Sequence, residues 1–167
     1  MIAALLLMLM ANTPQIPDTL VYGGENFAIQ QIPMLGIWDY SEEDLPPGKM
    51  KPPEFDLQGS GNWKGYEAKW LIRDSKLYLM KIKAKRDGKR IKNDQIFLGK
   101  QFPLHAYWFT GRIHLSVGGY NEQTKKSESV IVFQVEKGVV TNQSFNSESD
   151  IPSEWNGLRQ DRATGGQ

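Results

Sequence analysis

The chain has 167 residues, a length that fits one domain able to bury about 70% of the surface of its unfolded chain. Its 20 lysines and arginines nearly balance 19 acidic residues, and the net charge of +1 excludes a global electrostatic attraction to nucleic acid or anionic membranes. The chain contains no cysteine, which excludes disulfide bonds, thiolate metal sites and thiol catalysis.

The first eleven residues, MIAALLLMLMA, form an uncharged apolar run that ends well before the first charged side chain, Asp18. This length is typical of the hydrophobic region of a signal peptide and is too short for a transmembrane helix. Leu9 and Ala11 would be the −3 and −1 residues of a cleavage site after Ala11. We therefore predict a signal peptide over residues 1–11 and a periplasmic or secreted protein. The alternative is a buried segment of a cytoplasmic protein.

The next part of the chain combines prolines with one short hairpin pattern. Residues 12–18 predict an extended tether, because two prolines interrupt regular structure there. A hairpin is predicted over residues 19–32, where two apolar runs flank Gly23-Gly24. Residues 33–61 contain five prolines and no helical or strand period. We predict a long proline-rich loop there, and loops of this length are usually functional or disordered.

The densest pattern lies in residues 62–84, NWKGYEAKWLIRDSKLYLMKIKA, where apolar and polar side chains alternate as in half-buried strands. A two-residue turn at Asp74-Ser75 would set Ala68 opposite Lys81 and bury charge. We therefore predict a three-residue loop from Asp74 to Lys76, which collects the apolar side chains on one face. The predicted pairs are Ile72 with Tyr78, Trp70 with Met80, Ala68 with Ile82, Glu67 with Lys83, and Lys69 with Lys81.

Further strands and turns follow this hairpin. Turns are predicted at Asp87-Gly88, Gly118-Gly119 and Lys137-Gly138, and a polar loop over residues 121–129. Residues 130–136 predict a strand, because apolar residues alternate there; Ile131, Phe133 and Val135 share its buried face.

Taken together, these patterns predict a mainly β protein with little helix outside residues 1–11. We expect a single domain over residues 19–140, an antiparallel meander that forms a sandwich or a partial barrel. Apolar residues become sparse from Thr141 onward, so residues 141–167 predict a polar C-terminal tail.

Several of the same residues also resemble a known signature. They are Trp63-Lys64-Gly65-Tyr66, Ala68, Trp70, Ile72, Asp74 and Leu77-Tyr78-Leu79, followed by Trp108-Phe109-Thr110-Gly111 and Glu136-Lys137-Gly138-Val139-Val140. This order resembles an uncharacterised family of bacterial β-rich proteins, over about residues 20–140. The family has no established activity, so the resemblance implies a β-rich fold and no catalytic residue. Some members occur in settings that suggest toxin immunity, which implies a cytoplasmic protein.

Residues 81–92 contain seven basic side chains and one acidic one. In the predicted register the lysines at 81, 83 and 85 face solvent together. Lys83, Lys85 and Arg86 are therefore candidate residues for binding an anionic partner, and the alternative is a solvated face that blunts a strand edge. No exposed aromatic residues are interleaved with them, which argues against nucleic acid as the partner.

Trp63 and Trp108 are the second pair of candidate binding residues. Both lie near the ends of predicted elements, where an indole ring is partly exposed. The aromatic residues around them could line a pocket for a sugar or an apolar ligand, and the alternative is an ordinary core.

The sequence predicts no catalytic residue, metal site or cofactor. Paired carboxylates in a cleft and nucleophile–base motifs are both missing from the pattern. The two histidines, His105 and His114, are nine residues apart and would face opposite sides of a continuous strand, without a third ligand nearby.

We therefore expect an exported, non-enzymatic β-domain that binds another protein or a small ligand. The alternative is a toxin-immunity-type inhibitor that acts in the cytoplasm and contacts its partner through residues 33–61 or the basic residues. A hydrolase with scattered catalytic residues is the third and weakest reading.

Overall fold

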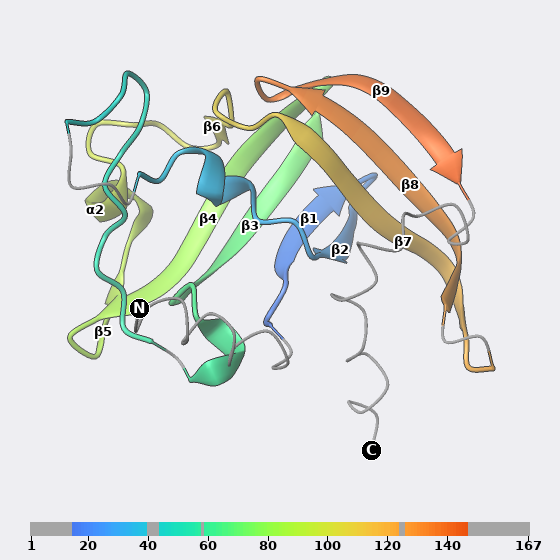
Figure 1. Cartoon of the computed structure of the whole chain (residues 1–167), viewed down its shortest axis with the longest axis horizontal. Coiled ribbons are helices and arrows are strands. Elements are labelled where there is room, and N and C mark those ends of the chain that lie inside the picture. The colour runs from blue at the N-terminus through green and yellow to red at the C-terminus, as the bar shows by residue number, and fades with distance from the viewer. Residues whose placement is uncertain (1–14, 40–43, 58, 124–125, 147–167) are drawn as a thin grey trace.

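The computed structural model describes residues 15–39, 44–57, 59–123 and 126–146, which include nine strands, one short α-helix and two 3-10 helices (Figure 1). The strands are β1 (Asp18–Tyr22), β2 (Glu25–Ile29), β3 (Tyr66–Arg73), β4 (Lys76–Arg86), β5 (Lys89–Ile91), β6 (Leu104–His105), β7 (Gly111–Asn121), β8 (Lys126–Glu136) and β9 (Val139–Asn146). The helices are η1 (Pro33–Gly36), η2 (Ser60–Asn62) and α2 (Asn93–Ile96). The predicted signal peptide, residues 1–11, lies outside the described residues.

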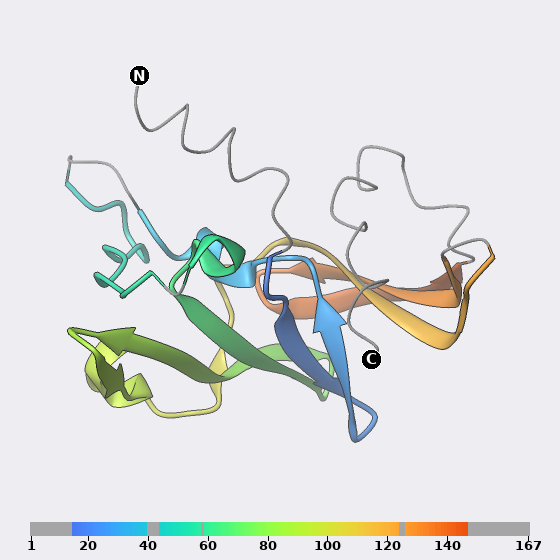
Figure 2. The ribbon, with the colours of Figure 1, turned by 90° about the horizontal axis from the view of Figure 1, so that it is seen from below.

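The strands join into one mixed sheet that curls into a nearly closed barrel (Figures 1 and 2). Its order is β2-β1-β3-β4-β9-β8-β7, with β5 and β6 also paired to β4. Trp70, Phe97 and Phe133 are the largest fully buried side chains in its interior. The predicted mainly β fold, a partial barrel with little helix, is confirmed. Within the described part of the chain, no helix is long and apolar enough to cross a membrane.

The first hairpin enters the sheet through a parallel pairing. β1 and β2 join at Gly23-Gly24 as predicted, with both glycines at positive φ. β1 also pairs with β3 in parallel. This is possible because β2 returns the chain to the end of the sheet where β1 begins, and the long connection after β2 leads from there to the other side of β1. Asp18 is the first residue of β1 and is buried, so the predicted tether of residues 12–18 is wrong at its last residue.

The hairpin of β3 and β4 has a two-residue turn, so the predicted three-residue loop from Asp74 to Lys76 is wrong, and so are two of the five predicted pairs. Asp74 and Ser75 both adopt positive φ, which gives the turn its tight geometry. Ala68 pairs with Ile82, Glu67 with Lys83 and Lys69 with Lys81, as predicted. The predicted pairs of Ile72 with Tyr78 and Trp70 with Met80 are replaced by Ile72 with Leu77 and Trp70 with Leu79.

A β-bulge at Met80 reconciles the short turn with the burial of apolar residues. One extra residue on β4 moves the inward face from Leu77 and Leu79 to Ile82 and Ala84, all of which are buried. The side chain of Asn93 occupies the edge of the bulge: its Nδ2 donates to Met80 O at 3.1 Å, and its Oδ1 accepts from Ile82 N at 2.9 Å. These bonds satisfy backbone groups that the interrupted ladder leaves without a strand partner.

The described parts of the predicted loop, residues 33–61, cover one end of the core. Met34, Ile37 and Trp38 are buried, and the Trp38 ring stacks on Phe97 with ring centroids 5.9 Å apart. A parallel bridge joins Trp38 to Met50. The apolar residues of this segment therefore belong to the core, although they follow no regular period.

The C-terminal strands extend further than their sequence suggested. β7 and β8 form a long hairpin that passes through Gly118-Gly119 with only an irregularity in register, so the predicted turn there is wrong. Strand residues also occupy most of the predicted loop 121–129. The turn at Lys137-Gly138 is confirmed. β9 continues through Asn146, which corrects the predicted start of the tail at residue 141, and residues 147–167 lie outside the described residues.

Candidate functional site

The outer side of β3, β4 and β5 carries a dense set of cations, which we name the basic face. It consists of Lys69, Lys81, Lys83, Lys85 and Arg90, all exposed, together with the half-buried Glu67. Strand geometry places them on one side, because residues two apart on a strand and residues directly opposite across a ladder share a face. The inward residues between them, Ala68, Ile82 and Ala84, are buried.

The basic face is arranged as three cross-strand pairs along β4. Lys69 lies opposite Lys81, Glu67 opposite Lys83, and Lys85 opposite Arg90. The central pair is an ion pair, with Lys83 Nζ 3.0 Å from Glu67 Oε1. The two outer pairs are like-charged, and such a pair destabilises a sheet by about 0.2–1 kcal/mol. Among the described residues, none of the four outer cations has an acidic partner within 4 Å.

A further like-charged pair lies beside the turn of the same hairpin but is partly compensated. Arg73 lies opposite Lys76, and its guanidinium is 3.7 Å from the Asp74 carboxylate. The same guanidinium lies 5.7 Å from the centre of the Tyr78 ring, a cation–π distance. The positive charge of Arg73 is therefore partly compensated, and the name basic face does not include this pair.

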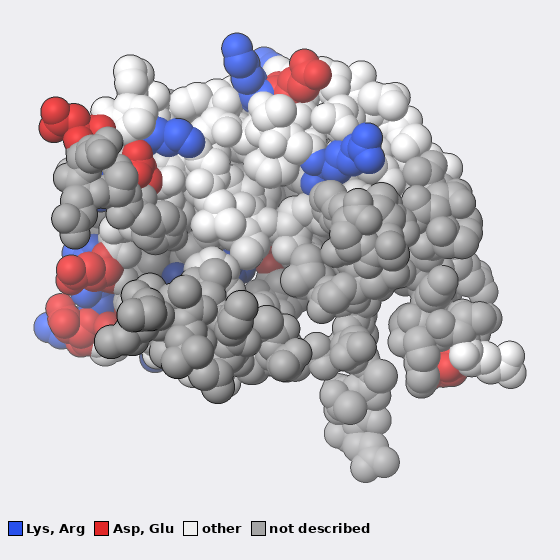
Figure 3. Space-filling view, viewed as in Figure 1, with Lys and Arg blue, Asp and Glu red and all other residues white. Residues whose placement is uncertain are grey.

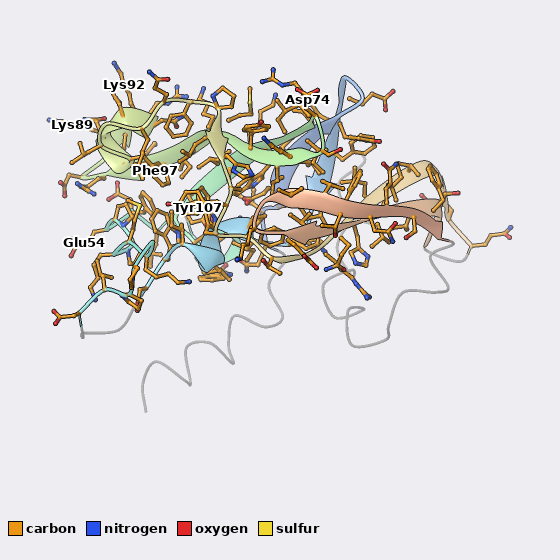
Figure 4. All side chains as sticks on the ribbon, turned by 90° about the horizontal axis from the view of Figure 1, so that it is seen from above. Glu54, Asp74, Lys89, Lys92, Phe97 and Tyr107 are labelled. Carbon is orange, nitrogen blue, oxygen red and sulfur yellow. The ribbon has the colours of Figure 1, made fainter. Side chains whose placement is uncertain are left out.

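The end of the basic face is held in place by the chain segment that precedes η2. The Asp56 carboxylate accepts hydrogen bonds from the turn amides of Asp87 and Gly88, at 2.9 and 2.8 Å. Arg86 Nε donates to Glu54 O at 3.1 Å. Figure 4 shows Lys89 and Lys92 at this end of the sheet and Glu54 on the segment beneath it. The β4–β5 turn is thus fixed, and the cations near it are presented on a rigid element.

The predicted binding residues Lys83, Lys85 and Arg86 therefore separate into two groups. Lys83 and Lys85 belong to the basic face, whereas Arg86 follows Lys85 directly and points to the other side, where it binds Glu54. Lys69 and Arg90 join the face from neighbouring strands. The prediction did not name Lys69, Lys81 or Arg90 as site residues. Its register already set Lys69 opposite Lys81, whereas the position of Arg90 opposite Lys85 depends on the β4–β5 ladder.

Trp63 and Trp108, the other predicted binding residues, occupy separate places. Trp63 follows η2 and is partly exposed, with its backbone amide near Gln15 Oε1 at 3.3 Å. Trp108 is half-buried; its Nε1 donates to Pro33 O at 3.0 Å, and its backbone lies against Gly36 of η1. The indole of Trp108 thus attaches η1 to the barrel, and the structure does not bring the two rings into one site.

A second polar cluster is buried between β1 and β3. Asp18 accepts hydrogen bonds from Lys64 Nζ at 2.6 Å, Ala68 N at 3.1 Å and Trp70 Nε1 at 3.1 Å. Both ionised side chains are almost fully buried, and the Lys64 ammonium also lies 5.1 Å from the centre of the Tyr66 ring. The three hydrogen bonds join the first residue of β1 to β3 and to the segment before it, so this cluster holds β1 in the sheet.

The histidines do not form a metal site. His105 Nε2 lies 3.2 Å from Gly138 O, whereas His114 is on β7, where its backbone amide donates to Gln31 Oε1. Across the residues that the structure describes, no group of three metal-ligating side chains is close enough to hold an ion. The predictions that no catalytic residue and no cofactor are present stay predictions.

Positive charges are more closely spaced on the basic face than on the side of the molecule shown in Figure 3. On that side the described surface is mostly uncharged, and Lys, Arg, Asp and Glu occur as isolated groups or mixed along the edge near β5.

Comparison of the chain with protein-family models, with curated proteins and with solved structures finds no match. The resemblance to the uncharacterised bacterial family stays a prediction.

Proposed function

We propose that this protein is a non-enzymatic binding domain that docks an anionic macromolecule on its basic face. One observation carries the proposal: the sheet holds two like-charged cross-strand pairs. Lys69 lies directly opposite Lys81, and Lys85 lies directly opposite Arg90. Such pairs reduce the stability of the isolated domain. Negative charges on a partner would turn this repulsion into attraction, which supports binding as the role of the face.

Neutralising one member of each pair is expected to separate stability from binding. We expect Lys81→Gln and Lys85→Gln each to raise the free energy of unfolding by about 0.2–1 kcal/mol, because each removes a cross-strand repulsion. The double variant should also recover less partner in affinity capture from the native host, and the difference should shrink at high salt. Unfolding in guanidinium chloride and quantitative mass spectrometry measure the two effects.

The matched control is Lys100→Gln, which removes an exposed cation from outside every strand. It should change neither unfolding nor partner recovery. Undiminished recovery by the double variant would contradict the proposal, whatever its stability.

Export of the protein is proposed on the apolar run of residues 1–11. We expect the mature protein from the native host to begin at residue 12 and to occur in the periplasm or the medium. Intact-mass spectrometry of fractionated cells measures both. A full-length chain confined to the cytoplasm would contradict export and favour the second candidate, a toxin-immunity-type inhibitor. The basic face also suits that role, because it would fit an acidic surface on a toxin.

A further inference from the structure

The cations of the basic face form two separate clusters. Lys81 and Lys85 lie four residues apart on β4, a separation of about 13 Å along the strand. The pair between them, Lys83 with Glu67, is already an ion pair and presents a carboxylate at the centre of the face. A ligand along β4 therefore meets positive, neutralised and positive positions in turn.

From this pattern we infer that the partner is a protein segment with two clusters of carboxylates about 13 Å apart. The inference rests on the proposed function and specifies its ligand. On an α-helix this spacing corresponds to about nine residues, and acidic side chains three or four residues apart would point together into each cluster.

The same pattern disfavours a nucleic acid. Phosphates follow one another without a gap along a nucleic-acid strand, so one of them would lie against Glu67. Four of the five cations are lysines, which lack the planar fork that binds phosphate in a bidentate manner.

Two carboxylates of the chain itself already bind groups of β4 and of the β4–β5 turn. Glu67 binds the ammonium group of Lys83, and Asp56 binds the amides of the β4–β5 turn. The turn amides are thus occupied and offer no additional site for phosphate. The outer four cations are the positions that a partner's carboxylates would fill.

Three labelled probes test this inference on the full chain by fluorescence anisotropy. The first is a helical peptide with two pairs of glutamates about nine residues apart, and the second has the same composition with all glutamates at its centre. The third is single-stranded DNA of equal charge. We expect the spaced peptide to bind about tenfold more tightly than the other two, because only its charges avoid Glu67.

Two variants provide independent readouts of the same arrangement. The Lys81→Gln/Lys85→Gln double variant should bind the spaced peptide about tenfold more weakly, and Lys100→Gln should bind it unchanged. Glu67→Gln should bring the centred peptide to within about twofold of the spaced one, because the central carboxylate is lost.

The outcomes distinguish the inference from the proposed function. Equal affinity of the parent protein for the two peptides, or tightest binding of DNA, would overturn the inference and leave an anion-binding face. Failure of all three probes to bind, together with unchanged partner recovery by the double variant, would overturn both.

Discussion

Replacement of Asp18 by alanine is expected to lower the free energy of unfolding by about 3–5 kcal/mol, because it leaves a buried charge without its partner. The Lys64 side chain is only 3% exposed, and its ammonium lies 2.6 Å from the Asp18 carboxylate. The substitution also removes the acceptor of Ala68 N and Trp70 Nε1. A loss of this size is a large fraction of the 5–15 kcal/mol that stabilises a typical domain.

Denaturation by guanidinium chloride, followed by tryptophan fluorescence and circular dichroism, measures this loss. The matched control is Glu67→Gln, which removes the carboxylate of the exposed ion pair with Lys83 and should change stability by no more than about 1 kcal/mol. The Asp18→Asn/Lys64→Met double variant should recover part of the loss, because no charge is then buried. If Asp18→Ala were no more destabilising than Glu67→Gln, the buried pair would not anchor β1.

Replacement of Gly138 by alanine is expected to lower the free energy of unfolding by about 2–5 kcal/mol. Its φ of +76° costs an alanine about 1–2 kcal/mol, and a Cβ would lie 2.7 Å from the Ala106 backbone and from His105 Nε2. Relief of that overlap adds about 1–3 kcal/mol. The affected site closes the barrel, because Gly138 O accepts a hydrogen bond from Leu77 N and so joins the β8–β9 turn to β4.

Gly88 provides a control with the same backbone conformation. It is the second residue of a two-residue turn, at φ +74°, and an added Cβ would meet nothing within 4 Å. Gly88→Ala should therefore lose only the conformational contribution of about 1–2 kcal/mol. The difference between the two variants in thermal and guanidinium unfolding isolates the close approach at Gly138. Equal losses would contradict a role for that contact.

The β3–β4 hairpin shows why pattern alone predicted only part of the register. Side-chain alternation placed Ala68 opposite Ile82 and Lys69 opposite Lys81 correctly. Near the turn, alternation cannot distinguish a three-residue loop from a two-residue turn with a bulge, since both place apolar residues inside. Asn93 stabilises the second solution with hydrogen bonds across the bulge, and its position depends on the path of the chain after β5.

The candidate site was also predictable in part. Lys83 and Lys85 followed from strand period, and their exposure is confirmed. The position of Arg90 on the face depends on the ladder between β4 and β5. Arg86 lies on the other side of the sheet, where it donates to the backbone oxygen of Glu54, more than thirty residues earlier in the chain. Contacts of this kind join segments that have no periodic relationship in the sequence.

Alternation and turn chemistry act between neighbouring residues, so the mainly β class and several turns could be predicted from the sequence alone. All six residues of the turns Gly23-Gly24, Asp87-Gly88 and Lys137-Gly138 have positive φ. Glycine and aspartate adopt this conformation readily, whereas Lys137 adopts it although lysine does not favour it. Three features could not be predicted in this way: the parallel placement of β1, the burial of Asp18 against Lys64 and the grouping of cations into two clusters. Each of these depends on which distant strands become neighbours, and that choice follows from burial across the whole core.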